Sequence, residues 1–428
     1  MTFPGFDPGY LANTAAEIED NVRRLRHHAS LALWCGNNEL EMGLVDHEWT
    51  ETAMSWDDYT PLMDELALDI VARLDPEHGY WPSSSHTPGA NRKIDANDPS
   101  AGDAHLWAVW HGGMPATQYR QSKHRFLSEF GFQSLPHPST VESFTVPADR
   151  DLTSPVMDLH QKAQVLGEPA NAELLRQLAL HFRSPSNWDG LVWQTQMLQA
   201  AVVGTGLEHW RRRAPATMGA LYWQLNDCWP GPSWSSIDYD GHWKALHYAA
   251  RRAFAPIVLT LLEDVERNTV EVHVSNDSNV DVDVAVTWTI TTATGTPLAE
   301  GRRSGTAAGG RTALLTTVEA ATAVATHGAR DVIVWAELDG HEDQRRVAVF
   351  VPVKHLSLED PGLSVAVAGT SVTLTVERPA LWVWVDSGTT RLRASDNFFH
   401  MRAGQRTLTL TEPGGTILAR SLFDTSRR

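Results

Sequence analysis

The stretch 31–41 reads LALWCGNNELE and decides the fold of this chain. Its first four residues have the apolar composition of a strand that is buried on both faces of a parallel sheet. Asn37, Asn38 and Glu39 follow this run directly. Because parallel α/β folds assemble active sites at the carboxyl ends of their strands, the stretch predicts a buried strand with a chemical site at its end. Glu41, two residues past Glu39, is expected to be solvated or salt-bridged.

A second segment of the same design lies further along the chain. Residues 125–132 form an apolar run that is interrupted by one carboxylate, Glu129. Glycoside hydrolysis needs two carboxyl groups: one protonates the leaving oxygen, and the other attacks the anomeric carbon or activates water. Glu39 and Glu129 are candidates for these roles. Each could instead be a solvated strand-end residue, since charged side chains are usually exposed.

At these residues the chain resembles a known family. The blocks WCGNNE at 34–39 and FLSEFGFQS at 126–134 are similar to the acid/base and nucleophile motifs of the β-mannosidases of glycoside hydrolase family 2. RRLRHHASLALW at 23–34 and GALYWQLNDCWP at 219–230 are similar too. The resemblance implies a retaining enzyme in which Glu39 is the acid/base, Glu129 is the nucleophile and Asn38 holds the sugar 2-hydroxyl.

Aromatic residues supply the other candidates for substrate binding, because sugar C–H faces stack on aromatic rings. Trp223 resembles the family's platform beneath the sugar, and by analogy Trp110 or His111 touches the nucleophile. Trp107 belongs to the same segment. Core packing remains the alternative for any single Trp. The run of Asp and His at 103–111 matches no zinc spacing, so neither a metal nor a cofactor is predicted.

Alternating strand and helix patterns up to residue 254 predict a parallel sheet or barrel. Helices are expected at 11–28, 61–74, 171–182, 191–210 and 244–254, and a strand at 218–225. The resemblance places 31–34 on the fourth strand of a (β/α)8 barrel, with the fifth to eighth near Tyr80, Leu106, Leu127 and Leu221. The predicted fold class is therefore α/β plus β: a partial (β/α)8 TIM barrel of strands 4 to 8, followed by two immunoglobulin-like β-sandwich domains.

The first three barrel strands and the family's N-terminal β-sandwich domains have no counterpart in this sequence. A partial barrel leaves unpaired strand edges and an open core, which is a liability for folding. We therefore expect a truncated gene product or a start codon that was assigned too far downstream.

Beyond residue 255 the sequence pattern predicts an all-β structure. Val270, Val272 and Val274 alternate with polar residues, and 331–338 and 345–353 predict a hairpin. ASDNFF at 394–399 is similar to the family's small immunoglobulin-like C-terminal domain. The predicted domains are the barrel portion at 1–254, a β-sandwich at 255–353 and the small domain at 354–428. They are expected to buttress the barrel, with carbohydrate binding as the alternative.

Composition excludes several classes of function. A net charge of −17 argues against nucleic acid or an anionic membrane as a partner, since both bind clustered cations. The two cysteines, Cys35 and Cys228, support neither a disulfide framework nor a zinc site. Without a transmembrane-length apolar run or the features of a signal peptide, the chain is expected to be cytoplasmic. Its oligomeric state is open.

The resemblance implies a retaining exo-β-mannosidase that hydrolyses terminal non-reducing β-D-mannose residues of oligosaccharides or glycans by double displacement. Its carboxyl groups are expected about 5 to 5.5 Å apart. N-terminal truncation is expected to impair the activity. The alternatives are another family 2 exo-β-glycosidase, with a galactoside, glucuronide or glucosaminide substrate, or a non-catalytic carbohydrate-binding remnant.

Overall fold

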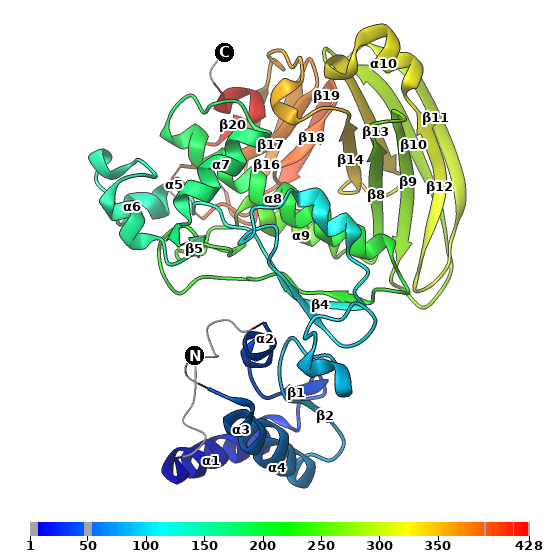
Figure 1. Cartoon of the computed structure of the whole chain (residues 1–428). Helices are drawn as coiled ribbons and strands as arrows, with labels where there is room; N and C mark the ends of the chain where they lie inside the picture. The colour runs from blue at the N-terminus through cyan, green and yellow to red at the C-terminus, as the bar shows by residue number, and fades with distance from the viewer. Residues whose placement is uncertain (1–6, 47–53, 166, 389–390, 414, 427–428) are drawn as a thin grey trace. The chain divides into compact units, whose positions relative to one another are not determined.

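The computed structural model describes residues 7–46, 54–165, 167–388, 391–413 and 415–426 (Figure 1). They belong to two compact units, which are described separately below. The first unit comprises Met1–Leu106, Ser122–Phe130 and Ala216–Leu221. The second comprises Trp107–Gln121, Gly131–Pro215 and Tyr222–Arg428. The domain boundaries expected from the sequence stay a prediction.

Every strand pair of the first unit's described residues is parallel. β1 (Leu33–Cys35) pairs with β2 (Gly79–Trp81). β4 (Phe126–Phe130) lies between β3 (Ala104–Leu106) and β7 (Gly219–Ala220). The strand expected at 218–225 is thus reduced to two residues, although all five predicted strand positions are occupied. Their assignment to strands 4 to 8 of a barrel stays a prediction.

The pairing of β1 and β2 continues past the strand ends. Asn38 and Ser84 form an isolated parallel bridge, in which the Glu39 amide donates to the Ser84 carbonyl at 2.7 Å. The Ser84 amide donates to the carbonyl of Asn37 at 3.0 Å. The polar residues after β1 and β2 are therefore fixed at the same edge of the pair.

The predicted burial of the first strand on both faces is wrong. Leu33 is 41% exposed, and β1 has no fully buried residue. Among the described strands, β1 has β2 as its only neighbour. An apolar strand is buried only as far as neighbouring elements cover its faces, and the described elements leave Leu33 partly uncovered.

Helices cover part of the first unit. Asp7 caps α1 (Pro8–Leu25) by accepting from the amides of Gly9 and Tyr10. The helix expected at 61–74 extends further back, because α3 (Trp56–Tyr59) and a π-helical segment (Thr60–Leu66) lead directly into α4 (Ala67–Leu74). Val22 of α1 packs with Ile70, Val71 and Leu74 of α4 in one small apolar core.

The second unit begins with helices around one long buried helix. The expected helices at 171–182, 191–210 and 244–254 are present as α7 (Asn171–His181), α8 (Trp188–Arg212) and α9 (Ala245–Ala253). The shorter elements are α5 (Pro138–Glu142), α6 (Pro155–His160), β5 (Gln164–Val165) and β6 (Glu168–Pro169). No helix among the described residues combines the length and apolarity required to cross a membrane.

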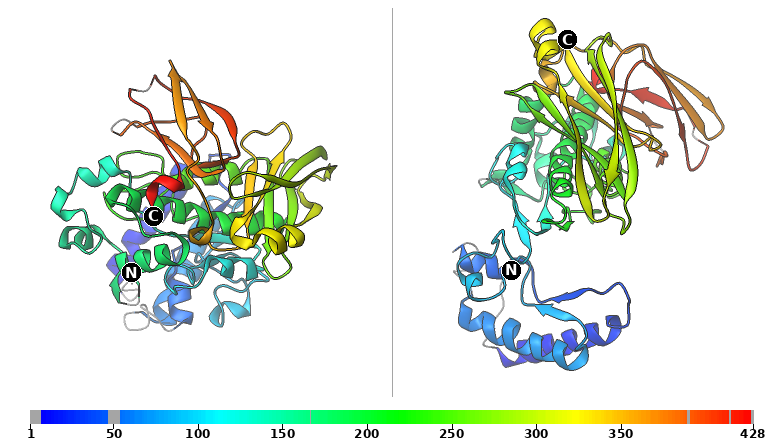
Figure 2. Two further views of the ribbon diagram at one scale, coloured as in Figure 1. Left: turned by 90° about the horizontal axis from the view of Figure 1, so that it is seen from above. Right: turned by 90° about the vertical axis from the view of Figure 1, so that its right-hand side faces the viewer.

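Two β-sandwiches complete the second unit (Figure 2). In the first, a sheet ordered β11-β10-β13-β14 faces a sheet ordered β12-β9-β8. Val270, Val272 and Val274 are fully buried between them, as their alternation predicts. The strands are β8 (Ile257–Asp264), β9 (Thr269–Asn276), β10 (Val282–Thr292), β11 (Pro297–Ala307), β12 (Arg311–Glu319), β13 (Val332–Leu338) and β14 (Arg345–Val349), with α10 (Ala321–His327) after β12.

The second sandwich is smaller and also has its own core. Its sheets are ordered β15-β16-β19 and β18-β17-β20. Val372, Leu374, Val383 and Leu408 are among its buried residues. The strands are β15 (Ser364–Ala368), β16 (Ser371–Val376), β17 (Ala380–Asp386), β18 (Phe399–Met401), β19 (Gly404–Thr409) and β20 (Leu418–Arg420).

Candidate active site

Glu39 stands at the junction of β1 and α2 (Leu40–Val45), where it is the N-cap residue of the helix. Asn37 fixes this turn, since its Nδ2 donates to the Pro82 carbonyl at 2.6 Å and its Oδ1 accepts from the Leu40 amide at 3.0 Å. The backbone of Glu39 is left-handed, with φ 63°. The Asn37 side chain thus shapes the turn, and the Glu39 carboxylate projects from it.

Glu129 lies on β4, next to His105 of β3 in the register of the two strands. Glu39 and Glu129 are both partly buried, with 20% and 13% of their side chains exposed. The two glutamates that sequence reasoning selected therefore lie in one unit, close to the same imidazole.

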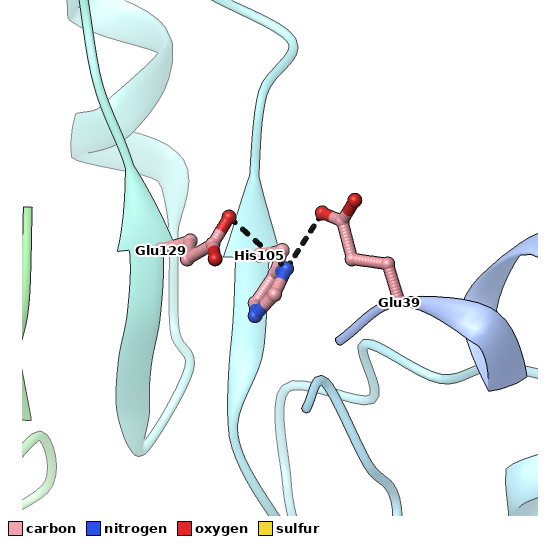
Figure 3. Close-up of side chains that lie close together, drawn as sticks. All are labelled: Glu39, His105 and Glu129. Carbon is pink, nitrogen blue, oxygen red and sulfur yellow. Dashed lines mark hydrogen bonds and ion pairs between the residues drawn. The ribbon is translucent and has the colours of Figure 1, made fainter. Parts of the chain in front are cut away.

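The fully buried imidazole of His105 lies between the two carboxylates (Figure 3). Its Nδ1 is 2.7 Å from Glu39 Oε1 and 3.4 Å from Glu129 Oε2. One ligand atom from each of the three residues lies within 4.8 Å of those from the other two. The structure thus brings the two predicted carboxylates together around a histidine that was not among the predicted site residues.

Asp103, which directly precedes β3, links the segment after β2 to β4. Its Oδ2 accepts from Ser84 Oγ at 2.7 Å and from Ser128 Oγ, and its Oδ1 accepts from the His86 amide at 2.9 Å. Ser84 Oγ also lies 3.0 Å from His105 Nε2. Sequence reasoning weighed Asp103 and His105 as metal ligands and as part of an Asp-x-His-x-Trp run that favours a mannoside substrate. Asp103 directly precedes β3 and lies two residues before His105, and this close spacing of an acid and a histidine was the signal for the network.

Glu41 belongs to a second, deeper network. It has no exposed surface, which excludes the expected solvated role and leaves the salt-bridged one. Its carboxylate meets His86 Nδ1 at 2.8 Å, Tyr59 Oη at 3.2 Å and Arg92 Nε at 3.8 Å. Burial, followed by the nearby Glu41 charge, raises the pKa of Tyr59, so this phenol stays a hydrogen-bond donor.

The remaining predicted site residues are not members of the group of three around His105. Asn38 directly precedes Glu39 and is exposed. Trp107, Trp110, His111 and Trp223 belong to the second unit, where the rings of Trp107 and His111 are 5.3 Å apart. Trp110 is fully buried against Phe132, whereas Trp223 is 40% exposed. The substrate-binding roles of all five stay predictions.

Among the described residues, Glu39, His105 and Glu129 are the one group with the spacing of a metal site. An imidazole nitrogen with two carboxylate oxygens is a donor set that divalent cations accept. The 2.7 Å separation of Nδ1 from Oε1 is equally that of a strong hydrogen bond. The same nitrogen and oxygen atoms that could bind a cation can therefore share a proton through a hydrogen bond instead.

Paired glutamates at the ends of parallel strands, in a chain that continues into β-sandwiches, are features of a glycoside hydrolase. Two protein-family models match the C-terminal part. They are the Mannosidase Ig/CBM-like domain over residues 268–355 and an Ig-fold domain over residues 358–425. Both sandwiches are thus immunoglobulin-like, as expected from the sequence.

The chain is also similar to individual proteins that are named β-mannosidases. The chain is 36% identical to the β-mannosidase of Capra hircus over 282 residues, covering 60% of this chain and 31% of that protein. For β-mannosidase B of Emericella nidulans the identity is 35% over 266 residues, covering 59% and 31%. The crystal structure of the β-D-mannosidase from Dictyoglomus thermophilum matches with a TM-score of 0.84 at 27% identity, covering 97% of this chain and 51% of that one.

These matches confirm the resemblance to the β-mannosidases of glycoside hydrolase family 2. The mixed α/β fold with immunoglobulin-like domains matches that of the Dictyoglomus enzyme. The chain spans about a third of the length of the curated relatives it matches.

Proposed function

We propose that this chain carries the catalytic carboxylates of a retaining exo-β-mannosidase, which hydrolyses terminal non-reducing β-D-mannose residues of oligosaccharides or glycans. The observation that carries the proposal is the approach of Glu39 and Glu129, whose nearest ligand oxygens lie within 4.8 Å. Retaining glycosidases place their carboxyl groups about 5 to 5.5 Å apart, whereas inverting ones leave about 6.5 to 9.5 Å for a water molecule. The short separation favours double displacement.

In the first step, the Glu129 carboxylate attacks the anomeric carbon and forms a glycosyl ester. Glu39 gives its proton to the leaving oxygen as the glycosidic bond breaks. In the second step, Glu39 takes a proton from water while the water oxygen displaces Glu129 from the sugar. Both glutamates return to their starting states, and mannose leaves with its anomeric configuration retained.

Mannoside specificity is the part of the proposal that the relatives support. The goat and Emericella proteins and the Dictyoglomus structure are all named β-mannosidases. We assign the five strands of the first unit to strands 4 to 8 of a catalytic barrel, and sugar binding to Asn38, Trp107, Trp110, His111 and Trp223. A galactoside, glucuronide or glucosaminide substrate is the alternative, which a panel of nitrophenyl glycosides tests.

Covalent labelling tests the mechanism. Dinitrophenyl 2-fluoro-β-mannoside carries a leaving group that departs readily, and its fluorine slows hydrolysis of the glycosyl ester. Incubation with the 428-residue chain, followed by proteolysis and mass spectrometry, is expected to find the label on Glu129. The Glu129→Gln variant is the matched control and takes no label. Labelling of another residue contradicts the assignment, and sugar binding without any label supports a carbohydrate-binding remnant.

A further inference from the structure

Both ring nitrogens of His105 have polar partners, although the proposed mechanism gives this residue no role. Nδ1 faces Glu39 and Glu129, and Nε2 faces Ser84. The side chain has no exposed surface. A buried imidazole whose nitrogens have fixed partners has a defined tautomer, so the protons of this cluster can be assigned from its hydrogen bonds.

Asp103 determines which way the Ser84 hydroxyl donates its proton. An ionised carboxylate only accepts hydrogen bonds, and Asp103 accepts three, from Ser84, Ser128 and the His86 amide. The Ser84 hydroxyl therefore donates its only proton to Asp103. Its oxygen is left to accept at 3.0 Å from His105, which requires a proton on Nε2. Ser84 and Asp103 thus select the Nε2–H form of His105.

The other nitrogen then shares a proton with Glu39. With Nε2 protonated, Nδ1 of a neutral imidazole has a lone pair, and an ionised Glu39 would oppose it with another lone pair at 2.7 Å. A separation this short requires one proton between the two atoms. Glu129 Oε2 lies farther from the same nitrogen, at 3.4 Å, so Glu39 is the closer partner of Nδ1.

We propose that His105 is a positioning residue which, held as the Nε2–H form by Ser84 and Asp103, shares with Glu39 the single proton of acid catalysis. This inference rests on the proposed function for its catalytic consequence. When the glycosidic bond breaks, the shared proton passes through Glu39 to the leaving oxygen, and a neutral His105 remains beside an ionised Glu39. When water attacks the glycosyl ester, its proton returns to the pair.

Nuclear magnetic resonance tests the tautomer without any need for activity. In the intact chain labelled with 15N-histidine, His105→Gln identifies the His105 resonances by their loss. We expect Nε2 to show the 15N shift of a protonated ring nitrogen. Ser84→Ala is expected to remove this preference. Ser128→Ala is the matched control, because Ser128 donates to the same Asp103 oxygen without contacting His105, and it is expected to keep the tautomer. A bare Nε2 in the unsubstituted chain overturns the proposal.

Kinetics test the catalytic consequence. Ser84→Ala is expected to lower kcat/KM about tenfold for a mannoside whose leaving group needs protonation, the size of one lost hydrogen bond. For dinitrophenyl mannoside, whose leaving group needs no proton, the loss is expected to be much smaller. Equal losses on both substrates overturn the role of His105. Failure of Glu129 labelling overturns the proposed function instead and leaves the tautomer result standing.

Discussion

Glu41 Oε1 lies 2.8 Å from His86 Nδ1, and both residues are buried. Removing one partner of a buried hydrogen bond costs about 1 to 3 kcal/mol, and more for a charged group, because the other polar group stays buried and unpaired. Glu41→Leu is therefore expected to lower the free energy of unfolding by about 3 kcal/mol, measured by urea denaturation. Glu65→Leu, at an exposed helical position, is the control. Equal stabilities of the two variants would contradict the prediction.

Glu39→Ala is expected to lower the rate of mannoside hydrolysis by about 10²- to 10⁴-fold, which is the usual contribution of a general acid or base. Azide needs no base to attack a glycosyl ester, so it is expected to restore turnover of dinitrophenyl mannoside and to release β-mannosyl azide. Product analysis by mass spectrometry and NMR checks this. Glu129→Gln, which removes the nucleophile, provides the contrast, since azide is not expected to produce the β-azide. An α-azide from Glu39→Ala would reverse the assignment of the two roles.

The turn that carries Glu39 tolerates no side chain at Gly36. A Cβ there would lie 2.6 Å from the Pro82 carbonyl oxygen and even closer to Tyr80 Oη. Gly36→Ala is expected to destabilise the chain by about 1 to 3 kcal/mol, as overpacking does, and to reduce labelling of Glu129. Gly204→Ala, in α8 with open space around its Cβ, is the control and is expected to leave both unchanged or to stabilise slightly. Thermal unfolding and the labelling rate provide the two measurements.

Lys244 provides a pH-dependent test of the second unit. Lys244 is 1% exposed, and burial lowers its pKa from 10.5 to about 8. The nearby charges of Asp227 and Asp238 raise the pKa, but by less than burial lowers it. Below pH 8 both the folded and the unfolded chain hold the Lys244 proton, and burying this charge destabilises the fold. Between pH 8 and 10.5 only the unfolded chain holds it, so this cost fades as pH rises.

Lys244→Met, which keeps the length of the side chain and removes the charge, is therefore expected to be more stable than the unsubstituted chain below pH 8. The upper limit of the gain is about 3 kcal/mol, from the size of the pKa shift. The advantage is expected to shrink from pH 8 to 10.5. Urea unfolding across this range measures it, with Lys123→Met at an exposed position as the control. A constant difference between Lys244→Met and the unsubstituted chain would refute the prediction.

Local pattern predicted much of the architecture. The alternation of Val270, Val272 and Val274 correctly placed them in a sandwich core, because period-two burial is a property of a strand itself. The apolar run at 31–34 predicted a strand, and β1 lies there. The burial of this strand depends on the elements that pack against it, which the sequence pattern does not reveal. Leu33 is therefore exposed although its composition predicted the opposite.

In the candidate site, too, local pattern pointed to some residues, and only the fold revealed the others. Glu39 and Glu129 were selected as candidates because each is a carboxylate at the end of or within an apolar run, and the fold places them close together. His105 was missed because its role comes from Ser84, a residue on another strand end, and from the register that places it beside Glu129. The salt-bridged reading of Glu41 was open from the sequence, yet only the fold reveals His86 as its partner.

The left-handed backbone of Glu39 has a consequence for how this sequence can change over time. A non-glycine residue with this conformation costs about 1 kcal/mol or more relative to glycine. Replacement of Glu39 by glycine would relieve that strain, but it would also leave the buried Nδ1 of His105 without its partner at 2.7 Å. The lost hydrogen bond opposes the relieved strain, so the local packing of the turn and the proposed chemistry both favour a carboxylate at this position.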